Sequence, residues 1–301
     1  MSIKEKLIKI TGEHHVFEQE PMSKHTTFRV GGPADFFVTP DNADEIEAVI
    51  GACNEENIPY YILGNGSNLL VGDKGYRGVI IQIYKNMSDV RVEGNKIYAQ
   101  AGALLSRVAA QALQNSLTGF EFASGIPGTL GGAVRMNAGA YGGEMKQVLE
   151  SAVVLTPEGK VLELSTEELR LGYRTSVIAE KGYAVISAVI RREPGDQDKI
   201  KEYMDELKDK RVTKQPLEFP SAGSTFKRPE GFFAGKLIED AGLRGFKVGG
   251  AQVSEKHCGF VINCGGATAA DIVELMKQVA DKVEAMAGVR LEPEVRRIGE
   301  F

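Results

Sequence analysis

The chain has 301 residues, a formal net charge of −5 at pH 7 and 43% hydrophobic residues. This composition is typical of a globular protein with about two or three compact lobes, and it excludes a fibrous or wholly disordered chain. Lysine and arginine residues are scattered along an acidic sequence, which argues against nucleic acid as a partner.

Cysteine and histidine usage argues against disulfides and metals. The three cysteines form no C-x-x-C pair, and the four histidines show no metal-ligand spacing. The N-terminal segment has no apolar core of signal-peptide length, and no segment approaches the roughly 18 apolar residues of a membrane span. We therefore expect a soluble cytoplasmic protein with no metal site and no membrane association.

The first part of the chain predicts an α+β domain. Apolar spacing indicates a short helix over 3–10, and then a strand at 34–40, a helix at 42–57 and a strand at 58–64. This strand–helix–strand order suggests a βαβ unit. Further elements are expected as strands near 90–101, 151–156, 160–164 and 183–191 and a helix near 103–115. We predict two lobes, roughly 1–84 and 85–195.

The second part predicts a smaller α/β domain over 196–301. A polar segment with proline and glycine at 192–200 is typical of a domain boundary, which we place near 195. Helices are expected at 199–212, at 233–241 and from 268 on, with strands near 250–254 and 259–263 and a final strand through 289–299. The helix from 268 is expected to bury Ile272, Leu275, Met276, Val279 and Val283.

Several familiar motifs are absent. Gly64 and Gly66 begin a G-x-G, but Leu69 stands where a dinucleotide-binding G-x-G-x-x-G needs its third glycine. The sequence also lacks a Walker loop, a G-x-S-x-G elbow and an H-E-x-x-H pair. These absences argue against a Rossmann dehydrogenase, a P-loop ATPase and a zincin.

Two glycine-rich stretches lie in the first part of the chain. They are "LGNGSNLLV" at 63–71 and "GIPGTLGGAVRMNAGAYGG" at 125–143, the second with a short helix predicted from Thr129. Each glycine inside a helix costs about 1 kcal/mol relative to alanine, so these residues require a reason. One possible reason is a tight turn or close helix packing, and the other is the close approach of a phosphate-bearing ligand. Two such stretches favour the ligand, and a flavin dinucleotide has the required shape.

Three polar residues are candidate catalytic residues, although each could instead have an ordinary structural role. Ser224 could be a turn hydroxyl, and Arg174 and Glu294 could be surface charges. No histidine neighbours Ser224 in the sequence, so it is a poor acyl-transfer nucleophile. A neutral hydroxyl could instead deliver a proton to a carbanion.

Six segments in a fixed order together resemble the UDP-N-acetylenolpyruvoylglucosamine reductase family over nearly the whole chain. They are "TTFRVGGPAD" (26–35), "LGNGSNLLV" (63–71), "GIPGTLGGAVRMNAGAYG" (125–142), "YRTS" (173–176), "SAGSTFKRP" (221–229) and "EPEVRRIG" (292–299). The resemblance implies a two-lobed FAD-binding domain of the vanillyl-alcohol oxidase type, followed by a substrate domain whose last strand returns toward the flavin.

The resemblance also implies a reaction of peptidoglycan precursor synthesis. NADPH reduces FAD, and the reduced flavin then reduces the enolpyruvyl ether of UDP-N-acetylglucosamine to UDP-N-acetylmuramate. NADPH and the nucleotide sugar are expected to bind in turn at one pocket, with ping-pong kinetics. The residues implied to bind FAD are Arg29, Gly64, Asn65, Gly66, Ser67, Asn68, Gly125, Ile126, Pro127, Gly128, Thr129, Gly131, Gly132, Asn137, Ala138 and Gly139.

The implied catalytic residues are Arg174, Ser224 and Glu294. Arg174 would bind the substrate carboxylate with a forked pair of hydrogen bonds, Glu294 would complete the polarising pair, and Ser224 would protonate the carbanion. One branch of the family has a tyrosine-bearing loop after the "YR" motif, and this chain lacks it. Tyr173, Lys227 and Arg228 are therefore our candidates for substrate binding.

Two alternatives are kept at this point. One is an FAD oxidase of the same flavin-binding fold, which would consume oxygen and would not use NADPH. The other is a nucleotide-sugar binding protein without turnover. In every case the expected partners are small molecules, and no obligate protein partner is evident.

Overall fold

The computed structural model describes residues 1–301, which fold into two compact units. The chain passes between the units several times, so neither unit is a single continuous segment. Unit 1 comprises Met1–Glu18, Phe36–Asn65 and Gly78–Arg211, and unit 2 comprises Gln19–Asp35, Gly66–Arg77 and Val212–Phe301. The domain limits predicted from the sequence remain a prediction.

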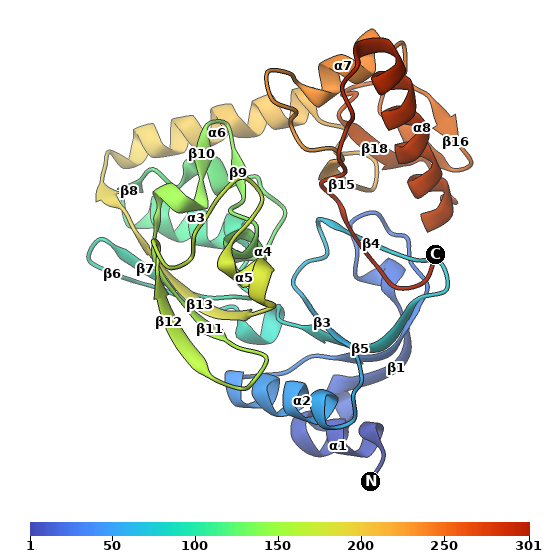
Figure 1. Ribbon diagram of the computed structural model, residues 1–301. Coiled ribbons are helices and arrows are strands. Elements are labelled where there is room, and N and C mark those ends of the chain that lie inside the picture. Colours follow the sequence, from blue (N-terminus) through green and yellow to red (C-terminus); the bar gives the residue numbers. More distant parts are fainter. The chain divides into compact units, whose positions relative to one another are not determined.

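Unit 1 contains most of the helices and strands of the first two-thirds of the chain (Figure 1). Its helices are α1 (Ile3–Thr11), α2 (Ala43–Glu55), α3 (Leu105–Gln114), α4 (Leu130–Arg135) and α5 (Val177–Lys181), and α6 (Gln197–Lys214) begins in it. Its strands are β3 (Tyr60–Leu63), β6 (Val90–Glu93), β7 (Lys96–Gln100), β8 (Leu117–Thr118), β9 (Gly139–Ala140), β10 (Gly143–Glu144), β11 (Leu149–Leu155), β12 (Val161–Ser165), β13 (Ala184–Arg191) and β14 (Glu193–Pro194).

Unit 2 contains the elements of the last third and a few earlier ones. They are β4 (Leu69–Val71), β15 (Ser221–Ser224), α7 (Ala234–Asp240), β16 (Lys247–Val248), β17 (Ala251–Val253), β18 (Phe260–Asn263), α8 (Ala269–Ala287) and β19 (Arg296–Ile298). Three strands continue from one unit into the other: β1 (Val16–Pro21), β2 (Pro33–Val38) and β5 (Tyr76–Gln82). Short 3-10 turns occur at Glu13–His15, Met22–Lys24, Lys85–Met87, Glu121–Ala123 and Met145–Gln147.

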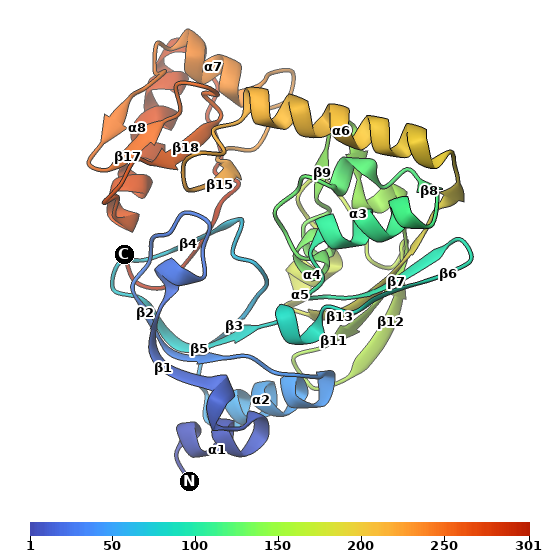
Figure 2. The same ribbon diagram turned by 180° about the vertical axis from the view of Figure 1, so that it is seen from behind.

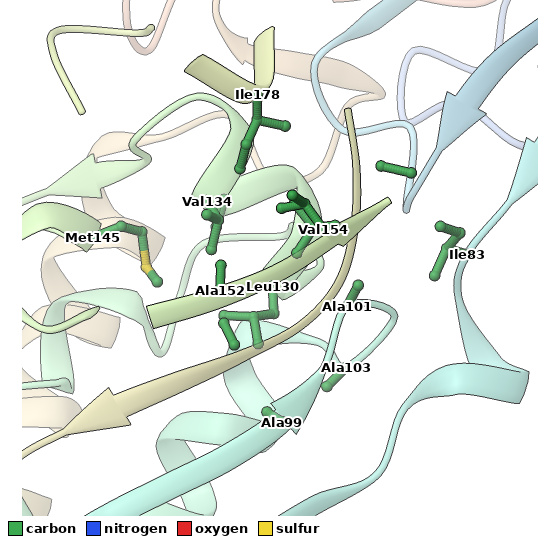
Figure 3. Packing of buried hydrophobic residues seen from close by; sticks show 14 of the residues in the cluster. Ile83, Ala99, Ala101, Ala103, Leu130, Val134, Met145, Ala152, Val154 and Ile178 are labelled. Carbon is green, nitrogen blue, oxygen red and sulfur yellow. The ribbon is translucent and has the colours of Figure 1, made fainter. Parts of the chain in front are cut away.

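The central sheet of unit 1 has five strands in the order β12-β11-β13-β7-β6, and every neighbouring pair is antiparallel. Helices α3 and α4 pack on it, and α3 contacts β6 and β7 (Figures 1 and 2). Figure 3 shows the buried core beneath α4, where Leu130 and Val134 pack with Ala152 and Val154 of β11. This packing fixes the helix that carries the second glycine-rich stretch.

The predicted strand–helix–strand run is present as β2, α2 and β3. These strands belong to a four-stranded sheet of order β1-β2-β5-β3, in which β5 separates β2 from β3 and pairs with β3 in parallel. The run is therefore not a simple βαβ unit with adjacent strands. The strand β1 was not predicted, because its mostly polar sequence "VFEQEP" lacks a clear alternation of apolar residues.

Unit 2 is built on an antiparallel sheet of order β15-β18-β17-β16, against which α8 packs (Figures 1 and 2). The five apolar residues predicted on one face of this helix are all buried. Thr268 and Asp271 form a capping box at its start, and both carboxylate oxygens of Asp73 accept hydrogen bonds from its first turn. The loop that follows β4 is therefore tied to α8.

The predicted final strand over 289–299 is wrong in length. Only Arg296–Ile298 forms a strand, β19, which pairs in parallel with β4. The residues before it make isolated contacts instead, such as the bridge between Pro293 and Phe226. The helix predicted over 129–139 is also shorter than expected and ends at Arg135, because Asn137 has a φ of 47°.

No helix of the structure is both long enough and apolar enough to cross a membrane. The structure also contains no group of three histidine, cysteine, aspartate or glutamate side chains that could hold a metal ion.

Candidate active site

The two glycine-rich stretches meet in unit 1. The side-chain amide of Asn65 donates a hydrogen bond of 2.7 Å to the carbonyl of Pro127. A Cβ added to Gly64 would lie 2.3 Å from Oγ1 of Thr129, the residue that caps the start of α4. The start of the first stretch and the start of the second are thus in direct contact, as expected if they serve one ligand.

A cavity of about 50 Å³ lies where they meet. Its walls include four predicted FAD-binding residues, Gly64, Thr129, Gly131 and Gly132, together with Ile83, Ala101 and Ile178, which Figure 3 shows around α4. The cavity is much smaller than a dinucleotide, so it can accept only part of one. It marks a glycine-lined opening next to apolar side chains.

Close packing already requires glycine at several of these positions. A Cβ added to Gly131 would lie 3.0 Å from Cβ of Ala101. A Cβ added to Gly143 would lie 2.4 Å from the ring of Phe122. At Gly132 it would meet only Thr129 Oγ1, at an ordinary 3.5 Å, and Gly132 lines the cavity. Packing therefore explains Gly131 and Gly143, and Gly132 is the glycine that an approaching ligand explains better.

Among the other predicted FAD-binding residues of this stretch, Asn137 makes contacts that shape the loop. Asn137 is buried, and its side chain donates to Glu144 and to the carbonyl of Gly172 while accepting from the amide of Lys146. Its side chain therefore supports the loop that precedes Arg174. The remaining predicted residues of this stretch in unit 1 are Gly125, Ile126, Pro127, Gly128, Ala138 and Gly139.

Arg174 lies at the tip of a tight turn in unit 1. Gly172 and Thr175 exchange two backbone hydrogen bonds across the turn, and Arg174 has a φ of 57°, which is unusual for a residue with a side chain. The buried hydroxyl of Ser176 donates to the carbonyl of Arg135 and anchors the turn to α4. The guanidinium of Arg174 stacks over the ring of Tyr173, 5.0 Å from its centroid.

The rest of the first glycine stretch belongs to unit 2. Gly66 has a φ of 63°, and an added Cβ would lie 2.0 Å from the carbonyl oxygen of His25. The amide of Thr27 donates to the carbonyl of Gly66, whereas the buried hydroxyl of Thr27 has no hydrogen-bond partner. Ser67 follows Gly66 in this stretch, and Arg29, also predicted to bind FAD, is exposed in the adjoining turn.

Ser224 is exposed at the end of β15 in unit 2. Ser221 pairs with Ile262 and Ser224 with Phe260, so β15 has one residue more than β18 between these pairs. The bulge contains Gly223, whose φ of 75° suits glycine. A bulge redirects the side chain that follows it, and here it ends the strand at Ser224.

Thr225 joins the segments of Ser224 and Glu294, which are 70 residues apart in the sequence. The carbonyl of Thr225 accepts a hydrogen bond of 2.8 Å from the amide of Glu294, and its amide donates 2.9 Å to the carbonyl of Gly259. Its hydroxyl accepts 2.9 Å from the amide of Val261. Thr225 is fully buried, so these bonds have no competing water.

The same segment reaches the first glycine stretch. The side-chain amide of Asn68 donates 3.3 Å to the carbonyl of Glu294, and the amide of Arg296 donates 3.1 Å to the carbonyl of Asn68. Unit 2 therefore brings together Ser224, Glu294 and Asn68 on three connected backbone segments.

The predicted substrate-binding cations follow Ser224. Lys227 pairs with Glu292 at 2.9 Å, and its amide donates to the carbonyl of Glu292. Arg228 donates from Nε to the carbonyl of Phe232 and stacks on the ring of Phe233.

Three residues near the site were missed by the sequence analysis. Arg135 and Tyr183 line the cavity beside Gly132. Arg211, near the end of α6, lies against Gly125 and forms no ion pair, and burial lowers the pKa of its guanidinium. A basic residue in a charged helix such as α6 is ordinarily solvated, so the sequence offers no signal that separates Arg211 from its neighbours.

Comparisons with known proteins identify the family of the chain. Residues 215–298 match the model of the C-terminal domain of UDP-N-acetylenolpyruvoylglucosamine reductase, and residues 34–165 match an FAD-binding domain. A UDP-N-acetylenolpyruvoylglucosamine reductase from Agathobacter rectalis is 56% identical over 298 residues, covering 95% of each chain. The chain belongs to the UDP-N-acetylenolpyruvoylglucosamine reductase family.

Other members of the family agree with this assignment. The reductase from Alkaliphilus metalliredigens is 51% identical, covering 98% of this chain and 97% of its own. The crystal structure of the Thermus caldophilus reductase superposes with a TM-score of 0.81 at 34% identity, covering 93% of this chain and 98% of that one. The chain is thus an FAD-dependent oxidoreductase of this family, and the comparisons favour neither the oxidase nor the binding protein considered above.

The residues present fit FAD. Thr129 borders the cavity with a polar group, Gly132 has no side chain to obstruct it, and Arg135 supplies a cation beside it. In unit 2 the unpartnered hydroxyl of Thr27, next to Gly66, is a buried polar group that a ligand could satisfy.

Proposed function

We propose that this chain reduces the enolpyruvyl ether of UDP-N-acetylglucosamine to UDP-N-acetylmuramate with NADPH, and that Arg174, Ser224 and Glu294 carry the chemistry. The observation that supports these roles best is the hydrogen bonding through Thr225, which holds the segments of Ser224 and Glu294 together. FAD, when bound, passes two electrons from NADPH to the enol ether.

Arg174 binds the substrate carboxylate. Its guanidinium can form two parallel charge-assisted hydrogen bonds, which strengthen as negative charge develops on the carboxylate side of the double bond. The turn of Gly172 and Thr175 and the support from Asn137 hold the arginine backbone in one unusual conformation. Such preorganisation reduces the reorganisation that the charged transition state requires. Glu294 completes the polarising pair.

Ser224 donates the proton. Its hydroxyl proton moves to the carbon next to the carboxylate, the electron pair of the enolate forms the new C–H bond, and the serine oxygen recovers a proton from solvent. The exposed position of Ser224 allows this recovery. A neutral donor also avoids a second negative charge beside the enolate.

We further propose that Gly64, Asn65, Thr129 and Gly132 in unit 1, and the stretch from Gly66 to Asn68 in unit 2, bind FAD. Unit 1 would carry most of the flavin contacts, and the segment over 196–301 would bind the nucleotide sugar. NADPH and the nucleotide sugar bind in turn, which gives ping-pong kinetics. The cytoplasmic location and the absence of an obligate protein partner remain part of this proposal.

The two half-reactions of the Ser224→Ala variant test the proposal. We expect NADPH to bleach its flavin at the wild-type rate, and reoxidation by the enol ether to slow by roughly 10²–10⁴-fold, as expected for loss of a general acid. Ser221→Ala is the matched control, because Ser221 lies in the same strand on the other side of the bulge. Loss of both half-reactions in Ser224→Ala, with folding and flavin content intact, would contradict the role of Ser224.

A further inference from the structure

The turn after Ser224 carries two exposed aromatic side chains. Phe232 is 44% and Phe233 is 62% exposed. A single exposed apolar residue is common on protein surfaces and requires no explanation. What distinguishes Phe233 is its partner, because the guanidinium carbon of Arg228 lies 4.0 Å from the centroid of its ring.

The backbone fixes this stacked pair. The amide of Phe232 donates 3.1 Å to the carbonyl of Pro229, and the carbonyl of Phe233 accepts from the amides of Lys236 and Leu237 at the start of α7. Arg228 also donates from Nε to the carbonyl of Phe232. Arg228 covers one face of the ring, and Phe233 is nevertheless largely exposed to solvent.

An aromatic ring backed by a cation is a platform for a nucleotide base. A flat base gains from stacking on such a ring, and the neighbouring cations can pair with its phosphates. Both kinds of group are present here within a few residues. Lys227 must release Glu292 to reach a phosphate, whereas Arg228 is already held in place by Phe233.

The order of these residues matches the order of groups along a nucleotide sugar. The segment begins at Ser224, is attached to Pro293 and Glu292 through Phe226 and Lys227, and then leaves toward Phe233. In the substrate the enolpyruvyl sugar is followed by the diphosphate and then by uridine. We propose that the ring of Phe233, backed by Arg228, binds the uracil base of the nucleotide sugar. This inference rests on the proposed function.

Binding of UDP to the FAD-loaded protein tests this site, measured by calorimetry. We expect Phe233→Ala to weaken UDP binding about 5- to 150-fold, the affinity equivalent of losing one stacked base, and to raise the KM for the enol ether similarly. Phe233→Trp should retain the affinity. Phe232→Ala is the matched control, because its ring is exposed but has no stacked guanidinium.

Binding of inorganic pyrophosphate distinguishes the contribution of the phosphates to UDP binding from the contribution of the base. Phe233→Ala should weaken pyrophosphate binding much less than UDP binding, because Arg228 keeps its hydrogen bond to the carbonyl of Phe232, whereas Arg228→Ala should weaken both. Wild-type UDP affinity in a folded, flavin-loaded Phe233→Ala variant would overturn the platform and leave the proposed function intact. A wild-type protein that binds UDP but never reoxidises with the enol ether would overturn the proposed reaction instead. Failure of the wild type to bind UDP would overturn both.

Discussion

Replacing Thr225 by valine tests how the site is held together. Valine has nearly the same shape as threonine but lacks the hydroxyl that accepts a hydrogen bond from the amide of Val261. The hydrogen bonds of Thr225 to Gly259 and Glu294 are made by its backbone and are formally retained. The substitution therefore removes one specific contact of the segment that carries Ser224.

The expected cost follows from burial. Thr225 is 0% and Val261 is 2% exposed, so water cannot replace the lost acceptor. Leaving a buried donor without a partner costs about 1–3 kcal/mol. We expect the free energy of unfolding to fall by about that amount. If this whole free energy were also lost from the stabilisation of the transition state, reoxidation by the enol ether would slow roughly 5- to 150-fold. This range is the upper limit of the expected effect on the rate.

Stopped-flow measurement of both half-reactions, with a thermal melt, provides the assay. NADPH should reduce the flavin of Thr225→Val at the wild-type rate, and only reoxidation should slow. Thr225→Ser retains the hydroxyl and should reoxidise at nearly the wild-type rate despite its lost methyl group. A Thr225→Val variant with wild-type stability and wild-type reoxidation would refute the reasoning.

Two further predictions concern titratable groups. Hydrogen bonds from the amides of Thr268 and Gly250 lower the pKa of Asp271 in the folded protein. The ionised carboxylate therefore stabilises the fold at pH values above its unfolded pKa of about 3.9, and this stabilisation is lost as the pH falls through the lower folded pKa. Asp271→Asn should therefore destabilise the protein by about 1 kcal/mol at pH 7 and hardly at pH 2, as measured by denaturant unfolding; equal loss at both pH values would contradict this. Burial raises the pKa of Cys53 to about 12, so a thiol reagent at pH 8 should label exposed Cys264 quickly and Cys53 only after unfolding; rapid labelling of Cys53 in the folded chain would count against its burial.

The elements with strong periodicity were predictable from the sequence. Helix α2 begins and ends close to its predicted limits, and α8 begins close to its predicted start, because a buried face and a capping residue define each of them. The strand β1 and the length of β19 were not predictable in this way. Their positions depend on pairing with distant residues, as in the parallel pair of β19 with β4, and local propensity does not contain that information.

The sequence motifs indicated candidate site residues, which remain predictions, but they did not indicate the contacts that support those residues. The motifs named Ser224, Glu294 and the glycine stretches, and the structure supplied the roles of Thr225 and Asn137 in holding them. A buried threonine beside a serine has no sequence signal of its own, because its partners Val261 and Gly259 belong to another strand. Hydrogen bonds between distant segments become visible only once the sheet is formed.

The most direct test of the central claim is the anaerobic visible spectrum of the FAD-loaded protein during two successive additions. The account predicts that NADPH bleaches the flavin absorbance and that one equivalent of enolpyruvyl-UDP-N-acetylglucosamine restores it with formation of UDP-N-acetylmuramate. Flavin that NADPH reduces but the enol ether leaves bleached would contradict the proposed reaction.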